Sequence, residues 1–124
     1  MKMDLGATRR VFIFKNFVVK IPNTQEYKLF ICGILANLQE KLWSGCHPDL
    51  AKVLWCSPLG LVLIMERAIT LSTDELREFD WLKFKEDLEE KYKDDDLGEF
   101  MLSDTKPDNW GYVGDRLVKI DYGN

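Results

Sequence analysis

Residues 104–123 read DTKPDNWGYVGDRLVKIDYG, and they carry more information about the fold than any other stretch of the chain. Asp104 and Asn109 stand five residues apart at its start, and Asp121 follows near its end. Between them, apolar residues on both sides of a Gly-Asp turn predict a short hairpin over residues 109–120. Carboxylate and amide side chains therefore stand before and after a single hairpin, a pattern typical of a metal- or phosphate-binding site.

On the N-terminal side of this stretch, the spacing of apolar residues predicts four more strands and two helices. The expected strands are residues 11–14, 17–21, 51–56 and 61–66, and the expected helices are residues 24–43 and about 72–93. The strands are runs of β-branched and aromatic residues bounded by turn residues, whereas the helices have apolar residues at three- and four-residue steps. The second helix opens with a capping box, Ser72-x-x-Glu75. This order predicts an α+β fold, an antiparallel sheet with helices against it.

Both helices are predicted to face the core with an apolar stripe. In the first helix the stripe is Tyr27, Phe30, Ile31, Ile34, Leu35, Leu38 and Leu42, and in the second it is Trp81, Phe84, Leu88 and Tyr92. Gly33 interrupts the first helix and is expected to mark a bend. The run Asp94-Asp95-Asp96 is expected to be a solvated end of the second helix rather than a second metal site.

Composition excludes several classes of protein. A chain of 124 residues with 46% hydrophobic and 31% charged residues predicts one globular domain, residues 1–124. The net charge of −4 argues against nucleic acid as a partner, because phosphate backbones attract basic proteins. The apolar runs are too short for a membrane span. Three scattered cysteines, Cys32, Cys46 and Cys56, predict free buried thiols and a cytoplasmic location.

The quoted stretch resembles the catalytic loop and metal-binding hairpin of the protein-kinase superfamily. That family has an Asp, then Lys-Pro, then an Asn five residues after the Asp, then a hairpin and Asp-Phe-Gly. Here Asp-Tyr-Gly stands in the last position. The resemblance implies that Asp104 orients the attacking hydroxyl and that Lys106 places positive charge near the transferred phosphate. It also implies that Asn109 and Asp121 bind Mg²⁺, with ATP as the nucleotide.

The same family pairs a lysine on its third strand with a glutamate on the next helix. Lys20 interrupts an apolar strand, where a buried ammonium needs an anion. The resemblance implies that Lys20 contacts the phosphates and pairs with Glu40, twenty residues later, with Glu26 as the alternative. Lys20 lies on a third strand only if a strand precedes residue 9, and that first strand is predicted to be truncated or absent.

The adenine site is expected at residues 61–68, which resemble the family's fifth strand and hinge. Met65 takes the gatekeeper-like position, and the Glu66 carbonyl and Ala68 amide would face the adenine edge. Gly6 occupies the position of the phosphate-covering loop, where the family has three glycines.

Two alternatives follow for that loop: either Arg9 or Arg10 supplies charge to the phosphates in place of the missing glycines, or the nucleotide is held loosely. At the catalytic loop, Leu102-Ser103 replaces the His-Arg that braces the loop in the family.

The resemblance implies a truncated kinase-like fold. Residues 1–66 resemble the N-lobe, an antiparallel sheet with one helix. Residues 67–124 resemble a hinge and a reduced C-lobe of about one helix plus the catalytic-loop hairpin. The resemblance implies a protein without the substrate-binding segments of a kinase, similar to small kinase-like proteins of phage or mobile elements.

Three functions are compatible with the sequence. The first is a miniature ATP-dependent phosphotransferase, and the second is a pseudokinase-type regulatory or inhibitory module that binds a partner without phosphoryl transfer. The third is a scaffold that binds no nucleotide. A shortened C-lobe is expected to expose apolar residues, with Phe100, Met101, Trp110 and Tyr112 as candidates. This predicts a homodimer or a host-protein partner.

Overall fold

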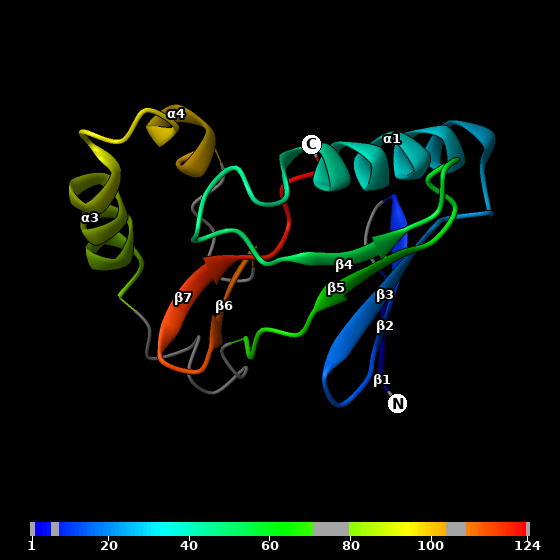
Figure 1. Cartoon of the computed structure of the whole chain (residues 1–124), viewed down its shortest axis with the longest axis horizontal. Helices are drawn as coiled ribbons and strands as arrows, with labels where there is room; N and C mark the ends of the chain where they lie inside the picture. Colours follow the sequence, from blue (N-terminus) through cyan, green and yellow to red (C-terminus); the bar gives the residue numbers. More distant parts are fainter. Residues whose placement is uncertain (1, 6–7, 71–79, 104–108, 124) are drawn as a thin grey trace. The chain divides into compact units, whose positions relative to one another are not determined.

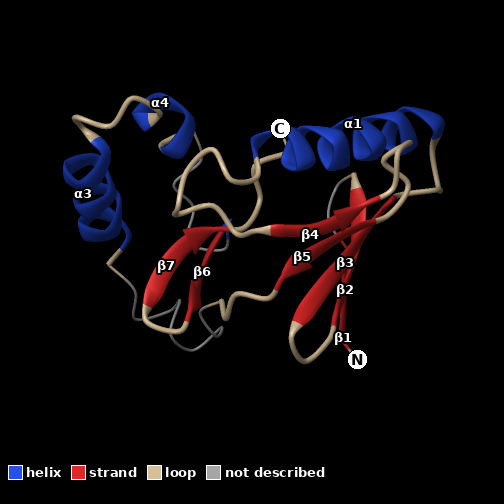
Figure 2. Cartoon of the chain, viewed as in Figure 1, coloured by secondary structure: helices blue, strands red, loops and turns tan. Residues whose placement is uncertain are grey.

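The chain forms two compact units, each with its own sheet. The computed structural model describes residues 2–5, 8–70, 80–103 and 109–123. One unit consists of Met1–Arg67 and Asp121–Asn124, and the other of Ala68–Ile120. The structure is mixed α+β, as the sequence predicts (Figure 2). Asp121 therefore belongs to the first unit, although the hairpin that precedes it belongs to the second.

The first unit is built on a five-stranded antiparallel sheet. Its strands, in spatial order, are β1 (Lys2–Leu5), β2 (Arg9–Ile13), β3 (Phe17–Pro22), β5 (Leu63–Glu66) and β4 (Val53–Cys56) (Figure 1). Of the two alternatives for the first strand, truncated or absent, the second is wrong, because a short β1 of four residues is present. Residues 2–5 mix charged and apolar residues and give a weak strand signal alone, but β2 pairs with them along their whole length. Lys20 consequently lies on the third strand.

Helix α1 (Tyr27–Trp43) packs on the sheet with a face that the sequence did not predict. Its buried residues are Gly33, Ala36, Asn37 and Glu40. The predicted apolar stripe is only partly turned to the core, because Phe30, Ile34 and Leu38 are half-buried and its other members are exposed. Tyr27 is 79% exposed and Leu42 75%, and Ile31 and Leu35 are exposed as well.

Small and polar residues orient α1 because they satisfy the sheet's polar groups at short range. The Asn37 amide donates to the carbonyls of Lys20, at 3.2 Å, and Gly60, at 2.9 Å. Gly33 allows the close approach, because a Cβ there would lie 2.5 Å from the Thr8 carbonyl oxygen. Gly33 is thus a contact point, and the helix is continuous through it, contrary to the predicted bend.

Among its described residues, the second unit has two helices and the predicted hairpin. Its elements are α3 (Trp81–Tyr92), α4 (Gly98–Met101), β6 (Trp110–Val113) and β7 (Arg116–Lys119). Asp80 caps α3 by accepting a hydrogen bond from the Lys83 backbone N–H. The predicted capping box at Ser72 and Glu75 lies outside the described residues.

The core of the second unit joins α3, α4 and the hairpin. Leu88 and Tyr92 are buried, as the stripe predicted for this helix requires. The Trp110 ring lies 6.1 Å from that of Tyr92. Met101 and Trp110 are also buried, so they are not the exposed partner surface that the sequence suggested. Phe100 is half-buried, whereas Tyr112 is exposed, as expected.

Two further predictions concern the burial of the cysteines and the absence of a membrane-spanning helix. Cys56 is buried as expected, but Cys32 and Cys46 are exposed, because Cys32 lies on the outer side of α1 and Cys46 in the turn that follows it. Among the helices that the structure describes, none combines the length and hydrophobicity needed to cross a bilayer.

Candidate functional site

Four charged side chains from distant parts of the sequence meet in the first unit and form what we call the charge cluster: Arg9, Lys20, Glu40 and Asp121. The pairing of β2 with β3 sets Val11 opposite Lys20 and Arg9 opposite Pro22. Because residues two apart share one face of a strand, Arg9 and Lys20 lie on the same face of the sheet. Glu40 reaches that face from α1.

Glu40 is the centre of the charge cluster and is fully buried. Its Oε1 accepts hydrogen bonds from Arg9 Nη1 at 2.6 Å and from Lys20 Nζ at 3.0 Å. Its Oε2 accepts from Arg9 Nη2 at 3.1 Å, Lys20 Nζ at 3.2 Å and the Tyr122 backbone N–H at 3.0 Å. A buried carboxylate is stable only when it is paired and hydrogen-bonded, and Glu40 meets both conditions.

Arg9 connects Glu40 to Asp121. Nη1 donates to Glu40 and to Asn37 Oδ1, the latter at 3.1 Å, while Nη2 donates to Glu40 and to Asp121 Oδ1 at 3.0 Å. Each terminal nitrogen of a guanidinium carries two hydrogens, so these four contacts use all of them. In this arrangement Arg9 cannot also donate through those nitrogens to a phosphate, which corrects the expectation drawn from the phosphate-covering loop.

The electrostatics follow from burial and from the opposite charges. Burial alone would raise the pKa of the Glu40 carboxyl, but Lys20 and Arg9 outweigh it and hold that pKa below its ordinary value. Burial lowers the pKa of the Lys20 ammonium, and Glu40 offsets part of that effect. Burial also acts to lower the pKa of Arg9, yet Glu40 and then Asp121 raise it above its ordinary value. Glu40 is therefore ionised at neutral pH.

The segment that carries Asp121 is fixed to α1 and to the loop before β4. The Tyr122 hydroxyl donates to the Ala51 carbonyl at 2.6 Å, and the Gln39 amide donates to the Tyr122 carbonyl at 3.1 Å. Burial, with the nearby Glu40 charge, raises the pKa of Tyr122 well above its ordinary range, so the hydroxyl stays protonated. A Cβ on Gly123 would lie 2.7 Å from the Ala36 carbonyl oxygen, so only glycine fits there.

Of the predicted site residues, Lys20, Glu40 and Asp121 are brought together. Glu26, the alternative partner of Lys20, is exposed at the N-terminus of α1, with no cap hydrogen bond from its side chain. Met65 is buried on β5 opposite Val18. Gly6, Asp104 and Lys106 lie outside the described residues.

The predicted hinge residues fall on both sides of the boundary between the units. Glu66 ends β5, and its carboxylate accepts from the Lys52 backbone N–H at 2.9 Å. Arg67 is the last residue of the first unit's main segment, and its backbone N–H donates to the Asn16 carbonyl at 3.3 Å. Ala68 begins the second unit and packs against Gly111.

In the second unit, Asn109 stands at the base of the hairpin, where its carbonyl accepts from the Ile120 N–H at 2.9 Å. Lys119 braces the segment that follows α4. Its ammonium is buried and donates to the Phe100 carbonyl at 2.9 Å and to Ser103 Oγ at 2.8 Å. Lys119 thus joins the end of β7 to the end of α4 and to Ser103.

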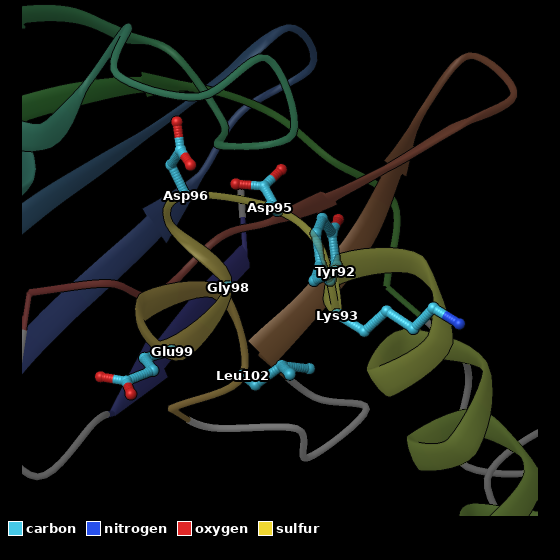
Figure 3. Close-up of a pocket in the computed structure, with 7 residues that line it drawn as sticks. All are labelled: Tyr92, Lys93, Asp95, Asp96, Gly98, Glu99 and Leu102. Atoms are coloured by element: carbon cyan, nitrogen blue, oxygen red, sulfur yellow. The ribbon is translucent and has the colours of Figure 1, made fainter.

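A shallow acidic hollow lies between α3 and α4 (Figure 3). Its lining includes Asp95, Asp96 and Glu99, and in the figure these carboxylates do not converge on one point. Asp95 accepts a hydrogen bond from the Leu97 N–H at 2.8 Å, which gives it a structural role. Among the described residues, no group of three acidic, His or Cys side chains is placed to hold a metal ion.

Sequence reasoning missed Asn37 and the role of Arg9 within the charge cluster. Asn37 carried a signal, since it lies one turn before Glu40, on the side of the helix occupied by small residues rather than by the apolar stripe, whereas nothing local marked the role of Arg9. Comparison with known proteins adds no identification, because no family model and no curated protein sequence matches the chain.

Proposed function

We propose that the chain is a kinase-like protein that binds ATP with Mg²⁺ at Lys20 and Asp121. The observation that carries the proposal is the buried pair of Lys20 on β3 and Glu40 on α1, with Asp121 joined to it through Arg9. Burial of two cations and a carboxylate costs free energy that apolar residues of similar size would not cost. A function that uses their charge explains their presence better than stability does.

The order of the strands supports the same proposal. Lys20 lies on the third strand and Glu40 on the helix that follows it, as the resemblance to kinases requires. The β6–β7 hairpin leads directly to Asp121. We propose Met65, Glu66 and Ala68 for the adenine and Gly6 for the phosphate-covering loop on the strength of the sequence resemblance alone.

Magnesium fits Asp121 by chemistry but not by its present contact. The Asp121 carboxylate is a hard oxygen ligand, and 41% of its side chain is exposed. However, Oδ1 accepts a hydrogen bond from Arg9 at 3.0 Å. A Mg²⁺ ion held by Asp121 would neutralise phosphate charge, and it would compete with Arg9 for this carboxylate.

Nucleotide binding is tested by calorimetric titration of the folded chain with Mg-ATP. Lys20→Met should weaken binding at least tenfold, while Lys15→Met, an exposed lysine in the β2–β3 turn, should not change it. Circular dichroism establishes that each variant is folded, and Lys20→Arg serves if Lys20→Met is not. Absence of binding to the wild-type chain at millimolar Mg-ATP would refute the proposal.

Phosphoryl transfer is a separate question with its own assay. With Asp104 as the base and Lys106 beside the transferred phosphate, label from γ-labelled ATP should reach an acceptor, and Asp104→Asn should abolish the transfer. Binding of ATP without any transfer would identify the chain as a pseudokinase.

The exposed side of α1 favours this second candidate, a regulatory module that docks on another protein. Tyr27, Ile31, Leu35 and Leu42 form what we call the α1 stripe, and all are exposed. Such a continuous apolar surface is typical of an interaction site.

Charge indicates the kind of partner. Lys28 and Lys41 are exposed on α1, and the helix's one acidic residue, Glu40, is buried. The stripe thus lies between positive charges on a chain whose net charge is −4. We infer that the partner presents an apolar ridge flanked by carboxylates. Pairing of two α1 helices would bring lysines together, which disfavours a second copy.

The partner surface is tested with a photocrosslinker on Cys32, which is exposed on α1, in a Cys46→Ser background. The crosslinked peptide should be apolar with acidic flanks, and Leu35→Asp should abolish the product. Leu59→Asp, at an exposed leucine outside α1, is the matched control. A crosslink to a basic peptide, or only to another copy of the chain, would contradict this candidate.

A further inference from the structure

We propose that the Arg9–Asp121 ion pair is a built-in competitor for both ligands of the nucleotide site, so that a phosphate and a divalent cation bind together and neither binds well alone. The inference rests on the proposed function and adds a specificity-determining role for Arg9. It is carried by the hydrogen bonds of Arg9, the charge of the cluster and the unequal exposure of its members.

The hydrogen bonds show that the site is closed to a phosphate. The terminal N–H groups of Arg9 are directed at Glu40, Asn37 and Asp121. The side chains of Arg9 and Lys20 are each 6% exposed. A phosphate oxygen can reach the terminal nitrogens of Arg9 most directly by taking the place of the Asp121 carboxylate, because Glu40 and Asn37 are buried.

The charges explain why one ligand alone binds weakly. Arg9, Lys20 and Glu40 together carry one positive charge, and Asp121 brings the sum to zero. A phosphate that arrives alone displaces Asp121 and leaves this carboxylate without its cation. A metal ion that arrives alone competes with Arg9 for the Asp121 carboxylate, and taking Oδ1 leaves the buried group with an uncompensated positive charge, which is costly. A metal–phosphate complex provides a cation for the Asp121 carboxylate and an anion for the Arg9 guanidinium at the same time.

The exchange requires little movement. Asp121 is the one member of the cluster with substantial exposure, and partly exposed ion pairs are weak because water screens them. The Tyr122 N–H, by contrast, remains bonded to buried Glu40, and Gly123 packs on Ala36. Rotation of the Asp121 side chain therefore opens the ion pair while the backbone stays in place.

Asp121→Asn tests the inference, since it removes the competing charge and preserves the size of the side chain. Inorganic pyrophosphate and ATP, each in excess chelator, are the probes, and binding is measured by calorimetry. The wild-type chain should bind neither probe appreciably under these conditions. Asp121→Asn should bind both at least tenfold more tightly than the wild type, without metal. Asp115→Asn makes the same change of net charge at an exposed turn and should behave as wild type.

The outcomes separate this inference from the proposed function. The inference is wrong if folded Asp121→Asn binds pyrophosphate no better than Asp115→Asn, or if the wild type binds ATP equally well with and without Mg²⁺. Asp121→Ala decides the matter if Asp121→Asn does not fold. Pyrophosphate binding by Asp121→Asn, with no Mg-ATP binding by the wild type, would support the ion-pair competitor and refute the nucleotide function. Mg-ATP binding by the wild type, with no pyrophosphate binding by Asp121→Asn, would support the nucleotide function and refute the ion-pair competitor.

Discussion

Replacement of Glu40 by Gln should strongly destabilise the first unit. Glu40 is fully buried and accepts five hydrogen bonds, four from the side chains of Arg9 and Lys20 and one from the Tyr122 backbone. A glutamine of the same shape has one acceptor oxygen, and its amide nitrogen directs hydrogens at groups that also donate. Two buried cations would lose their shared counter-ion.

The magnitude follows from measurements on buried ion pairs. Removal of one partner costs about 3–5 kcal/mol, because the remaining charge stays buried. A chain of this size has a free energy of unfolding of roughly 6–19 kcal/mol. The substitution should therefore remove a large fraction of the stability of the first unit.

Urea unfolding followed by circular dichroism measures the effect. Hydrogen exchange of the β3 and α1 amides assigns it to the first unit, since protection reports local opening. Glu26→Gln makes the same chemical change at an exposed position of the same helix and should cost less than about 0.5 kcal/mol. A loss below about 1 kcal/mol for Glu40→Gln would refute the view that buried charges hold α1 to the sheet.

Three further predictions concern stability. Acid should reduce the difference in free energy of unfolding between the wild type and Glu40→Gln. The pKa of the Glu40 carboxyl lies below its ordinary 4.5 in the folded chain, so the unfolded chain takes up the proton first, and the wild type loses stability as the pH falls from about 4.5 through the folded-state pKa. Urea titrations at each pH measure the difference. Gly33→Ala should destabilise by about 1–3 kcal/mol in thermal unfolding despite alanine's helix propensity, because its Cβ meets the Thr8 carbonyl, while Cys32→Ala should be neutral. Lys119→Met should cost about 1–3 kcal/mol in urea, because it leaves the Phe100 carbonyl without the donor that Lys119 supplies.

The sequence predicted where the strands and helices lie along the chain better than it predicted which side of a helix is buried. Strands β2 to β5, the hairpin and α1 lie close to the expected residues, because their composition and turn signals are local. The orientation of α1 was predicted wrongly, because periodicity assumes that the apolar side faces the core. Here Asn37 and Glu40 hold the other side against the sheet, and that preference depends on partners far away in the sequence.

The site shows the same division between local and distant signals. Lys20 and Glu40 could be selected because a lysine inside an apolar strand needs an anion. The contact between Arg9 and Asp121 joins residues 112 positions apart, and no local pattern predicts it. The return of Asp121 to the first unit likewise depends on Tyr122 and Gly123 packing against α1, not on the hairpin itself.

Calorimetric titration of the wild-type chain with Mg-ATP tests the central claim most directly. A saturable heat of binding is predicted, with one nucleotide per chain, lost in Lys20→Met and retained in Lys15→Met. No heat of binding at millimolar Mg-ATP, or equal binding by both lysine variants, would contradict a nucleotide site at the charge cluster.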